Sequence, residues 1–307
     1  MMLIIKLIFC FSFNLMLIVN CGCDQLDHIL ERHRTYCGIS RAKAQQKFDL
    51  PSTNTITNSS TDIDLTIRIV GGIDATRDEF PWQISFRKWS PRLKRWYHSC
   101  GGALIDNQWV LTAAHCQELD LNVSKIISHS GFSMITIDHD ISLIKLSEPV
   151  SMGIKSQFVP ICISNMEQSL KSPFKECISS GWGKLKMQGK FPTILQKVTI
   201  NVIDPIECKK AYETVANITD GMICSGEDGK GTCEGDSGGP LQCLDHVSND
   251  NILVTNNANN NNLDINQRWT LYGLTSWAVG CAEGPFPSVA ARVALYRDWI
   301  AQTIINN

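Results

Sequence analysis

A serine set among glycines is the feature of this sequence most suited to covalent chemistry. The run GDSGGP at residues 235–240 surrounds Ser237 with small residues, which permits a tight turn that presents the hydroxyl and nearby backbone N–H groups to one point. A serine hydroxyl is a weak nucleophile at neutral pH and needs an adjacent base. The run TAAHC offers the imidazole of His115, and DHDISL offers the carboxylate of Asp140. A glycine-rich serine loop alone is usually an ordinary turn, but the three runs together indicate nucleophilic hydrolysis.

The order and composition of these runs resemble the chymotrypsin family of serine endopeptidases, from residue 69 to about residue 304. The resemblance implies that His115 takes the proton of Ser237 and later delivers it to the leaving amine, while a buried Asp140 holds the imidazole tautomer. It also implies an oxyanion hole made by the backbone N–H groups of Gly235 and Ser237, where losing one donor typically costs ~3 kcal/mol. We expect His139 to be a surface residue. An esterase or lipase is excluded, because it would need the order Ser-Asp-His and a strand–elbow–helix setting.

The run RIVGG at residues 68–72 implies, by the same resemblance, a zymogen cleaved between Arg68 and Ile69. The freed amine of Ile69 then turns inward and pairs with Asp236, which organises the oxyanion hole and the specificity pocket. The alternative, an ordinary loop bond, is disfavoured by the polar leader before it. Pairing with a carboxylate raises the pKa of the amine. Activity should therefore persist below that raised pKa and fall as the pH rises through it, and a flat alkaline limb would count against the pairing.

The specificity pocket implied by the family has its floor six residues before the nucleophile, at Gly231. Trypsin-like members carry aspartate there to receive Lys or Arg, whereas Gly231 supplies no charge. The side chains of Ala278 and Ser288 narrow the walls, which are commonly glycine in open pockets. We expect cleavage after small to medium apolar residues, with acceptance of aromatic residues as the close alternative, and no self-activation at Arg68. The implied substrate-binding residues are Gly231, Ser276, Trp277, Ala278 and Ser288.

The N-terminal segment has the pattern of a signal peptide. Thirteen mostly apolar residues, Leu7 to Val19, follow Lys6; this run is too short to span a bilayer comfortably, and a retained signal anchor is the alternative. Residues 24–68 are polar and poor in aromatic residues, which predicts a flexible leader. We therefore assign residues 1–23 to a signal peptide, 24–68 to a propeptide and 69–307 to the peptidase domain, and we expect secretion to the extracellular space.

The 13 cysteines fit an oxidising compartment. Signal cleavage after Cys23 leaves ten, whereas cleavage after Cys21 leaves one unpaired. The family includes zymogens whose leader stays tethered by a disulfide, so we expect the pair Cys37–Cys162 in addition to the pairs that the resemblance implies directly. Those pairs are Cys100–Cys116, Cys177–Cys243, Cys208–Cys224 and Cys233–Cys281. Three sequons for N-glycosylation, at Asn58, Asn122 and Asn217, also suit secretion.

The elements that must position the site are short runs rich in Val, Ile, Trp and Phe, broken by Gly and Pro. Such runs, at residues 82–86, 109–112, 195–202 and 269–277, predict an all-β fold. Leu295, Trp299 and Ile300 recur at helical spacing, so residues 294–304 predict a closing helix. The resemblance implies two packed six-stranded antiparallel barrels. Residues 245–267 are rich in asparagine and predict a loop inserted in a hairpin, to which we assign no function.

One departure from the family concerns the first barrel. His115 and Asp140 are 25 residues apart, whereas the family spacing is about 45. The missing piece lies just after Cys116 and shortens the first barrel, which would expose unpaired strand edges. Either a shortcut in the fold repairs the barrel, or the sequence lacks a segment at this place. Some relatives bind calcium in this region, but we predict no metal and no cofactor here. The alternative to an active endopeptidase is a catalytically impaired homologue that binds proteins or regulates a cascade.

Composition restricts the partners. A net charge of −2 with 43% hydrophobic residues gives no indication of a nucleic-acid partner or an acidic membrane surface. We expect protein or peptide substrates, an activating trypsin-like protease and protein inhibitors, with no nucleic acid and no membrane as partner, and a monomer. A digestive role and a role in a cascade both stay open.

Overall fold

The computed structural model describes residues 28–30, 32–33, 36–40, 70–118, 123–166, 169, 176–246, 267–282 and 284–307. The predicted signal peptide, the Arg68–Ile69 junction, two of the three sequons (Asn58 and Asn122) and residues 247–266 of the predicted loop lie outside the described residues.

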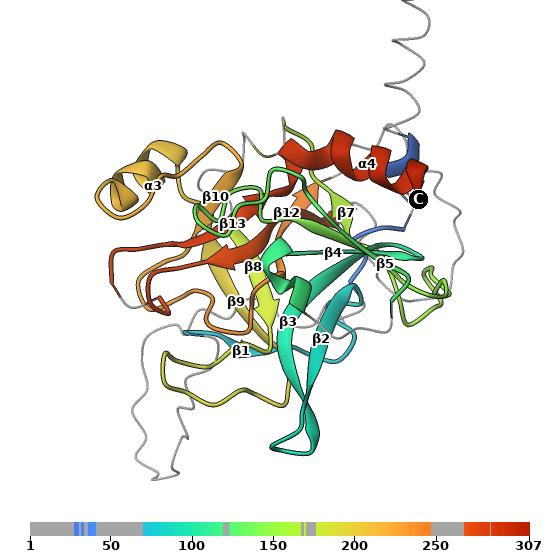
Figure 1. The fold of residues 1–307 in the computed structure, drawn as a ribbon, viewed down its shortest axis with the longest axis horizontal. Helices are drawn as coiled ribbons and strands as arrows, with labels where there is room; N and C mark the ends of the chain where they lie inside the picture. Colours follow the sequence, from blue (N-terminus) through green and yellow to red (C-terminus); the bar gives the residue numbers. More distant parts are fainter. Residues whose placement is uncertain are drawn as a thin grey trace, which may run out of the picture.

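The described chain is built mainly of strands, which form two sheets packed side by side (Figure 1). The strands are β1 (Ile73–Asp74), β2 (Gln83–Ser90), β3 (Arg95–Asp106), β4 (Trp109–Thr112), β5 (Lys125–Ser128), β6 (Ser142–Lys145), β7 (Cys162–Ile163), β8 (Glu176–Gly181), β9 (Gln196–Asn201), β10 (Met222–Ser225), β11 (Pro240–His246), β12 (Gln267–Trp277) and β13 (Ser288–Arg292). The helices are the 3₁₀ turns η1 (Ala114–Glu118) and η3 (Val293–Tyr296) and the α-helices α3 (Pro205–Tyr212) and α4 (Arg297–Asn306).

The first sheet has five strands in the order β2-β3-β4-β6-β5, all antiparallel. Among the described residues this sheet has five strands where a full barrel has six, which agrees with the prediction that the first barrel is shortened. Within the described residues no ladder joins β2 to β5, so the sheet is open there. The central strand β4 is buried along its whole length, and Trp82 and Leu111 pack in the same core. Hydrophobic burial thus holds this sheet together without ring closure.

The second sheet has eight strands, in the order β1-β9-β8-β11-β12-β13-β10, with β7 joined to β12. The strands β8 to β13 provide the six antiparallel strands that the family resemblance implies. Two short strands extend the sheet, and one of them corrects the prediction of purely antiparallel pairing, because β7 runs parallel to β12. The family's double-barrel architecture is otherwise confirmed.

The helices lie at the edges of the sheets. The predicted C-terminal helix is α4, which starts at Arg297, three residues later than predicted, because residues 293–296 form a 3₁₀ turn. Ile300 is fully buried in the core of the first sheet, and Trp299 and Ile304 pack against it. The helix α3 was not predicted from the sequence; its N-terminus is capped by the Asp204 carboxylate, which accepts from the N–H of Ile206 at 2.8 Å. Among the helices of the described residues, none is long and apolar enough to span a membrane.

Five disulfides join the ten cysteines in the pairs expected from the family. They are Cys37–Cys162, Cys100–Cys116, Cys177–Cys243, Cys208–Cys224 and Cys233–Cys281. The first of them links the leader to β7 of the second sheet.

The leader is docked beside this first disulfide. The N–H of Gly38 donates to the carbonyl of Pro160 at 2.8 Å, and its own carbonyl accepts from the N–H of Trp269 at 3.0 Å. The φ of Gly38 is +67°, and an added Cβ there would lie 2.8 Å from the backbone nitrogen of Trp269, so only glycine fits. Nearby, the buried carboxylate of Asp106 pairs with Arg32 at 2.9 Å and with His33 at 2.8 Å. These contacts hold part of the predicted propeptide against the catalytic domain.

Candidate active site

The strands β4 and β6 bring His115 and Asp140 together. They are antiparallel neighbours, and Thr112 at the end of β4 pairs with Ser142 at the start of β6. His115 follows β4 in the turn η1, and Asp140 precedes β6, so both reach the same edge of the sheet. The register of the β4–β6 ladder brings His115 close to Asp140, and the shortened connection between the two residues leaves this arrangement intact.

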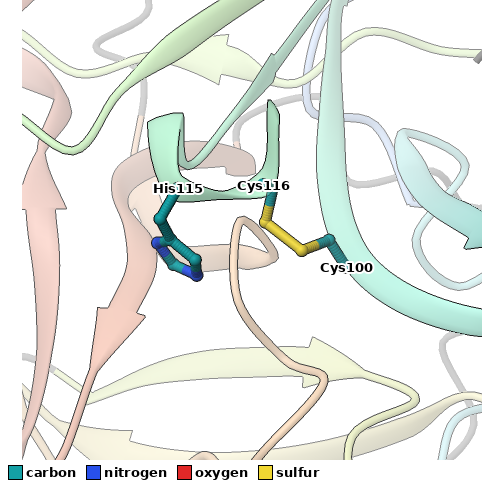
Figure 2. A group of neighbouring side chains, drawn as sticks. All are labelled: Cys100, His115 and Cys116. Atoms are coloured by element: carbon teal, nitrogen blue, oxygen red, sulfur yellow. A yellow bond between two sulfur atoms is a disulfide. The ribbon is translucent and has the colours of Figure 1, made fainter. Parts of the chain in front are cut away.

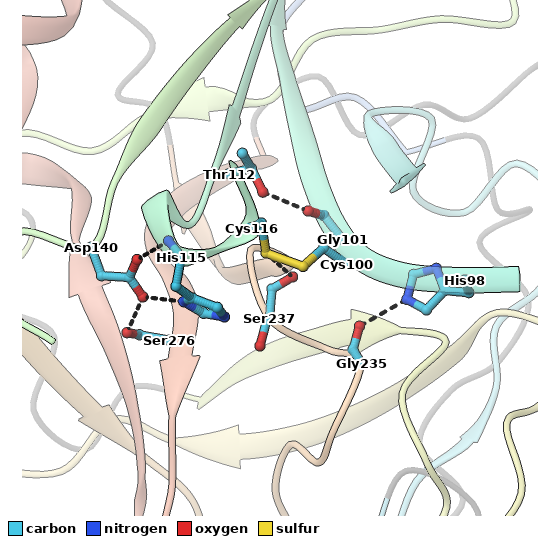
Figure 3. Close-up of a disulfide and its surroundings, with 10 residues drawn as sticks. All are labelled: His98, Cys100, Gly101, Thr112, His115, Cys116, Asp140, Gly235, Ser237 and Ser276. Carbon is cyan, nitrogen blue, oxygen red and sulfur yellow. Dashed lines mark hydrogen bonds and ion pairs between the residues drawn. A yellow bond between two sulfur atoms is a disulfide. The ribbon is translucent and has the colours of Figure 1, made fainter. Parts of the chain in front are cut away.

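The carboxylate of Asp140 is 2% exposed and accepts three hydrogen bonds. One comes from the backbone N–H of His115 at 2.9 Å, and another from its Nδ1 at 2.7 Å. The third comes from the hydroxyl of Ser276. Since a carboxylate oxygen only accepts, the contact between Nδ1 of His115 and Asp140 places the proton of the neutral imidazole on Nδ1 and leaves Nε2 as an acceptor. Figure 3 shows the three side chains in this arrangement. Ser276 was predicted only as a substrate-binding residue, and its contact with Asp140 was missed.

Ser237 lies on a loop tied to both sheets. Its carbonyl accepts from the N–H of Gly101 on β3 at 2.7 Å, and the N–H of Gly238 donates to the carbonyl of Thr275 on β12 at 2.7 Å. Gly238 has a φ of +76°, and an added Cβ would lie 2.9 Å from the backbone nitrogen of Ala113. The hydroxyl of Ser237 is near the His115 ring in Figure 3, although the two do not form a hydrogen bond in this structure. Such contacts often tighten only when substrate is bound.

The backbone around Ser237 leaves two N–H groups available. In the same loop, the N–H groups of Asp236, Gly238 and Gly239 all donate to carbonyls. Within the described residues, those of Gly235 and Ser237 have no such acceptor. The carbonyl of Gly235 accepts from Nε2 of His98 at 2.8 Å, and its φ is +98°. The two N–H groups expected to form an oxyanion hole are thus among those that the described part of the fold leaves without an acceptor.

Asp236, in the same loop, is buried. Its carboxylate accepts from the N–H of Gly183 at 2.8 Å and from that of Cys233 at 3.0 Å. Burial raises the pKa of Asp236 to about 6, against the lowering effect of these two hydrogen bonds. Val70, the first described residue after the expected cleavage site, packs against Cys233 and accepts from the N–H of Gly231 at 3.2 Å. The chain following the junction therefore reaches the loop that contains Asp236.

The predicted pocket floor carries hydroxyl groups. An added Cβ on Gly231 would lie 3.1 Å from Oγ of Ser288 and 3.0 Å from Cβ of Ala282. Oγ of Ser288 accepts from the backbone N–H of Thr232 at 3.2 Å and from its hydroxyl at 3.0 Å. Thr232 was missed by the sequence analysis, although it directly follows Gly231. Of the predicted wall residues, Ala278 is half-buried, as is Trp277, whose ring packs edge-on against Tyr212.

Comparison with known proteins agrees with this geometry. The trypsin family model matches residues 69–300. The chain is 34% identical to trypsin of Sus scrofa over 262 residues, covering 78% of this chain and 97% of that protein. It is 33% identical to trypsin of Xenopus laevis, covering 78% and 92% respectively, and 33% identical to serine protease 1 of Canis lupus familiaris, covering 80% and 93%.

This chain belongs to the trypsin family. The resemblance inferred from the three runs is thereby confirmed at the level of the family.

A cluster of potential metal ligands in this trypsin-family chain consists of Cys100, His115 and Cys116, whose ligand atoms lie within 4.8 Å of one another. Figure 2 shows that His115 and Cys116 project from the same short turn and that Cys116 is bonded to Cys100. A thiolate is the form of cysteine that binds metals, and both sulfur atoms are used in the disulfide. The Cys100–Cys116 disulfide of this cluster therefore braces the turn that carries His115.

The side chain of His139 is 37% exposed. Its ring stacks on that of His129 with centroids 4.8 Å apart, and its Nδ1 is 3.2 Å from the hydroxyl of Tyr296. Burial, followed by the charge of His139, lowers the pKa of His129. The pair thus packs against Tyr296 and against Trp299 of the C-terminal helix. Among the predicted sequons, Asn217 is described and lies exposed after α3.

Proposed function

We propose that this serine endopeptidase of the trypsin family hydrolyses peptide bonds through Ser237, His115 and Asp140 and is made as a zymogen. The observation that carries the proposal is the bond from Nδ1 of His115 to the buried carboxylate of Asp140 at 2.7 Å, beside a serine loop with two unpaired N–H groups. The bond to Asp140 directs Nε2 of the imidazole, the basic nitrogen, toward the loop of Ser237.

In the proposed reaction, Nε2 of His115 removes the proton from Ser237 as its oxygen attacks the substrate carbonyl. Asp140 stabilises the imidazolium that forms, and the N–H groups of Gly235 and Ser237 bind the resulting oxyanion. His115 then gives the proton to the leaving amine, and water hydrolyses the acyl-enzyme by the same steps. The hydroxyl of Ser276 adds a second side-chain donor to Asp140 and so keeps its orientation.

Activation is proposed to occur by cleavage at Arg68–Ile69. Asp236 is fully buried with only backbone N–H donors among its described partners, and burial raises its pKa to about 6. A buried carboxylate of this kind is stabilised by an arriving ammonium, and the docked position of Val70 supports Ile69 as its source. The pocket supports a different protease as the activator, because cleavage after Arg68 calls for a trypsin-like enzyme.

The enzyme is proposed to prefer substrates with an apolar residue on the acyl side of the cut bond. Gly231 contributes no charge, and the hydroxyl of Ser288 already accepts two hydrogen bonds from Thr232. Asp228 and Glu234, the acidic residues nearest to the floor in sequence, are both exposed. A Lys or Arg side chain would therefore lose its hydration without gaining an ion pair.

Secretion belongs to the same proposal, with residues 1–23 as the signal peptide, 24–68 as the propeptide and Asn58, Asn122 and Asn217 as glycosylation sites. Protein inhibitors and a monomeric state complete it. A catalytically impaired homologue is not favoured, because the geometry between His115 and Asp140 is intact.

The test is to express the zymogen, cleave it briefly with trypsin, remove the trypsin and profile a peptide library. The Ser237→Ala protein, treated in the same way, is the matched control for residual trypsin. Cleavage after apolar residues by the wild type alone is the expected result. Equal profiles for the two proteins would refute an active enzyme, and a preference for Arg or Lys would refute the proposed pocket.

A further inference from the structure

The strands β2 and β3 continue beyond the first sheet as a projecting hairpin (Figure 1). We call residues 87–97 the basic hairpin. Its strands are in register, with Arg87 opposite His98 and Trp89 opposite Trp96. The hydroxyl of Ser90 accepts from the N–H of Leu93 at 3.1 Å, so the turn at its tip is an ordered part of the fold.

The basic hairpin carries a dense positive charge. Residues 80–105 contain no Asp or Glu, so no carboxylate of the hairpin itself offsets this charge. Within the described part of the chain, none of its cationic side chains forms an ion pair, in contrast with Lys184 and Lys197. The hairpin thus concentrates an unneutralised charge on a molecule whose net charge is −2. The cationic residues are Arg87, Lys88, Arg92, Lys94 and Arg95.

Large apolar side chains lie between these charges. Trp89 is 45% exposed and Trp96 53% exposed, and their rings pack edge to face across the strands at 5.6 Å. Leu93 and Tyr97 are also exposed. Tryptophan, tyrosine and arginine are the residues enriched at the energetic centres of protein–protein contacts. The composition of this surface therefore fits a polypeptide partner with negative charge.

The basic hairpin leads directly to the loop of Ser237. His98, at its base, donates from Nε2 to the carbonyl of Gly235 at 2.8 Å, and its ring packs on Trp182. Side chains two residues apart in a strand share a face, so Trp96 lies on the same face as His98, about 7 Å along the strand. Burial is the main cause of the lowered pKa of His98, and the charge of Arg87 acts in the same direction. The basic hairpin is therefore joined through His98 to the loop of Ser237.

The hairpin is on the leaving-group side of the site. In Figure 3, Ser276 and His98 lie on opposite sides of Ser237. The segment of Ser276 to Ala278 is the proposed site for the acyl side of the substrate, so the residues after the cut bond run toward His98 and the basic hairpin.

We infer that the basic hairpin binds acidic segments of protein substrates that follow the cut bond, an inference that rests on the proposed endopeptidase function. The cations attract the carboxylates, and the exposed Trp89–Trp96 pair packs against their aliphatic stems. Single surface ion pairs contribute little, but several acting together on one segment should raise kcat/KM about tenfold at low salt. The preference should shrink as salt screens the charges.

The test uses two fluorogenic peptides with the same acyl side. One has Glu and Asp at the third to sixth positions after the cut, and the other has Gln and Asn there. For each protein the ratio of the two kcat/KM values is measured, which cancels the amount of active enzyme. The variant is Arg92→Glu/Arg95→Glu, and the matched control is Lys155→Glu/Lys210→Glu, which changes two exposed lysines outside the hairpin. Mass spectrometry after reduction verifies that activation has left the hairpin uncut.

The wild type and the control should favour the acidic peptide about tenfold, and the hairpin variant should favour it at most twofold. Two equal rates in the wild type would overturn the inference while leaving the endopeptidase function intact. A second measurement is independent of activity: the acidic peptide should change the tryptophan fluorescence of Ser237→Ala protein but not of the same protein carrying the hairpin changes. Binding of phosphatidylserine vesicles or heparin to the hairpin, with no response to the acidic peptide, would also overturn the inference.

Discussion

The carboxylate of Asp140 accepts from the backbone N–H and Nδ1 of His115 and from the hydroxyl of Ser276. These contacts fix both the position and the tautomer of the imidazole. Two of the donors belong to His115, the residue whose position they fix, and the third is the hydroxyl of Ser276 on β12 of the second sheet. Ser276 is therefore proposed as a positioning residue, a role that differs measurably from contact with substrate.

Replacing Ser276 by alanine should lower kcat about tenfold, since a hydrogen bond to a charged group typically contributes about 1.5–3 kcal/mol. KM for an apolar peptide should stay within about twofold. Steady-state kinetics of the activated variant measure both values. A raised KM with an unchanged kcat would instead indicate that Ser276 acts mainly in substrate binding.

The pKa of Asp236 makes the uncut zymogen sensitive to pH. Burial raises this pKa from 3.8 to about 6, so the folded zymogen holds a proton that the unfolded chain releases. Its contribution to stability is present below pH 3.8 and lost as the pH rises through about 6, by roughly 3 kcal/mol in total. Urea unfolding of the zymogen at pH 4.5 and 7 should show about 2 kcal/mol of this loss in the wild type and a smaller loss in Asp236→Asn. Equal losses would contradict it.

Substitutions of Gly231 test whether the charge of the pocket floor sets the substrate preference. A new Cβ there would lie 3.0 Å from Cβ of Ala282 and 3.1 Å from Oγ of Ser288, closer than van der Waals contact, so these neighbours must shift by a few tenths of an ångström to admit it. Gly231→Asp should raise the ratio of kcat/KM for Arg over apolar peptides at least tenfold, because the carboxylate pairs with the guanidinium. Gly231→Asn, similar in shape but uncharged, is the control. An equal ratio in both variants would show that the floor does not set specificity by charge.

At the scale of elements, the β4–β6 ladder explains how the site tolerates the shortened first sheet. The pairing of Thr112 with Ser142 fixes where His115 and Asp140 emerge, and the Cys100–Cys116 disulfide braces the turn that follows β4. The open edge between β2 and β5 lies elsewhere in the sheet order. The loss of a strand at that open edge therefore changes the barrel without separating His115 from Asp140.

The leader should stay attached after activation, because Cys37–Cys162 and the ion pairs of Asp106 join it to the catalytic domain. Protein cut at Arg68 should migrate as one species without reductant and as two chains with it. In the control Cys37→Ser/Cys162→Ser, the two chains should separate in denaturing gels without reductant. Release of the wild-type leader under those conditions would contradict the tether.

At the scale of the whole molecule, the sequence sufficed to predict an all-β fold and the C-terminal helix, because strand runs and helical spacing are local signals. The helix α3 was missed because only Cys208 and Tyr212 of its side chains are buried, which gives no periodic pattern. Its signal was the Asp204-Pro205 start, with a capping side chain and a proline in the first turn. The contact between Ser276 and Asp140 joins residues 136 positions apart in different sheets, and no local pattern could have indicated it.

The most direct test of the proposed triad is the rate at which the trypsin-activated protein cleaves a single apolar peptide, compared with Ser237→Ala prepared in parallel. We predict a kcat/KM at least about 10³-fold higher for the wild type, with both proteins cut at Arg68–Ile69. Equal rates in the two proteins would contradict the assignment of Ser237 as the nucleophile.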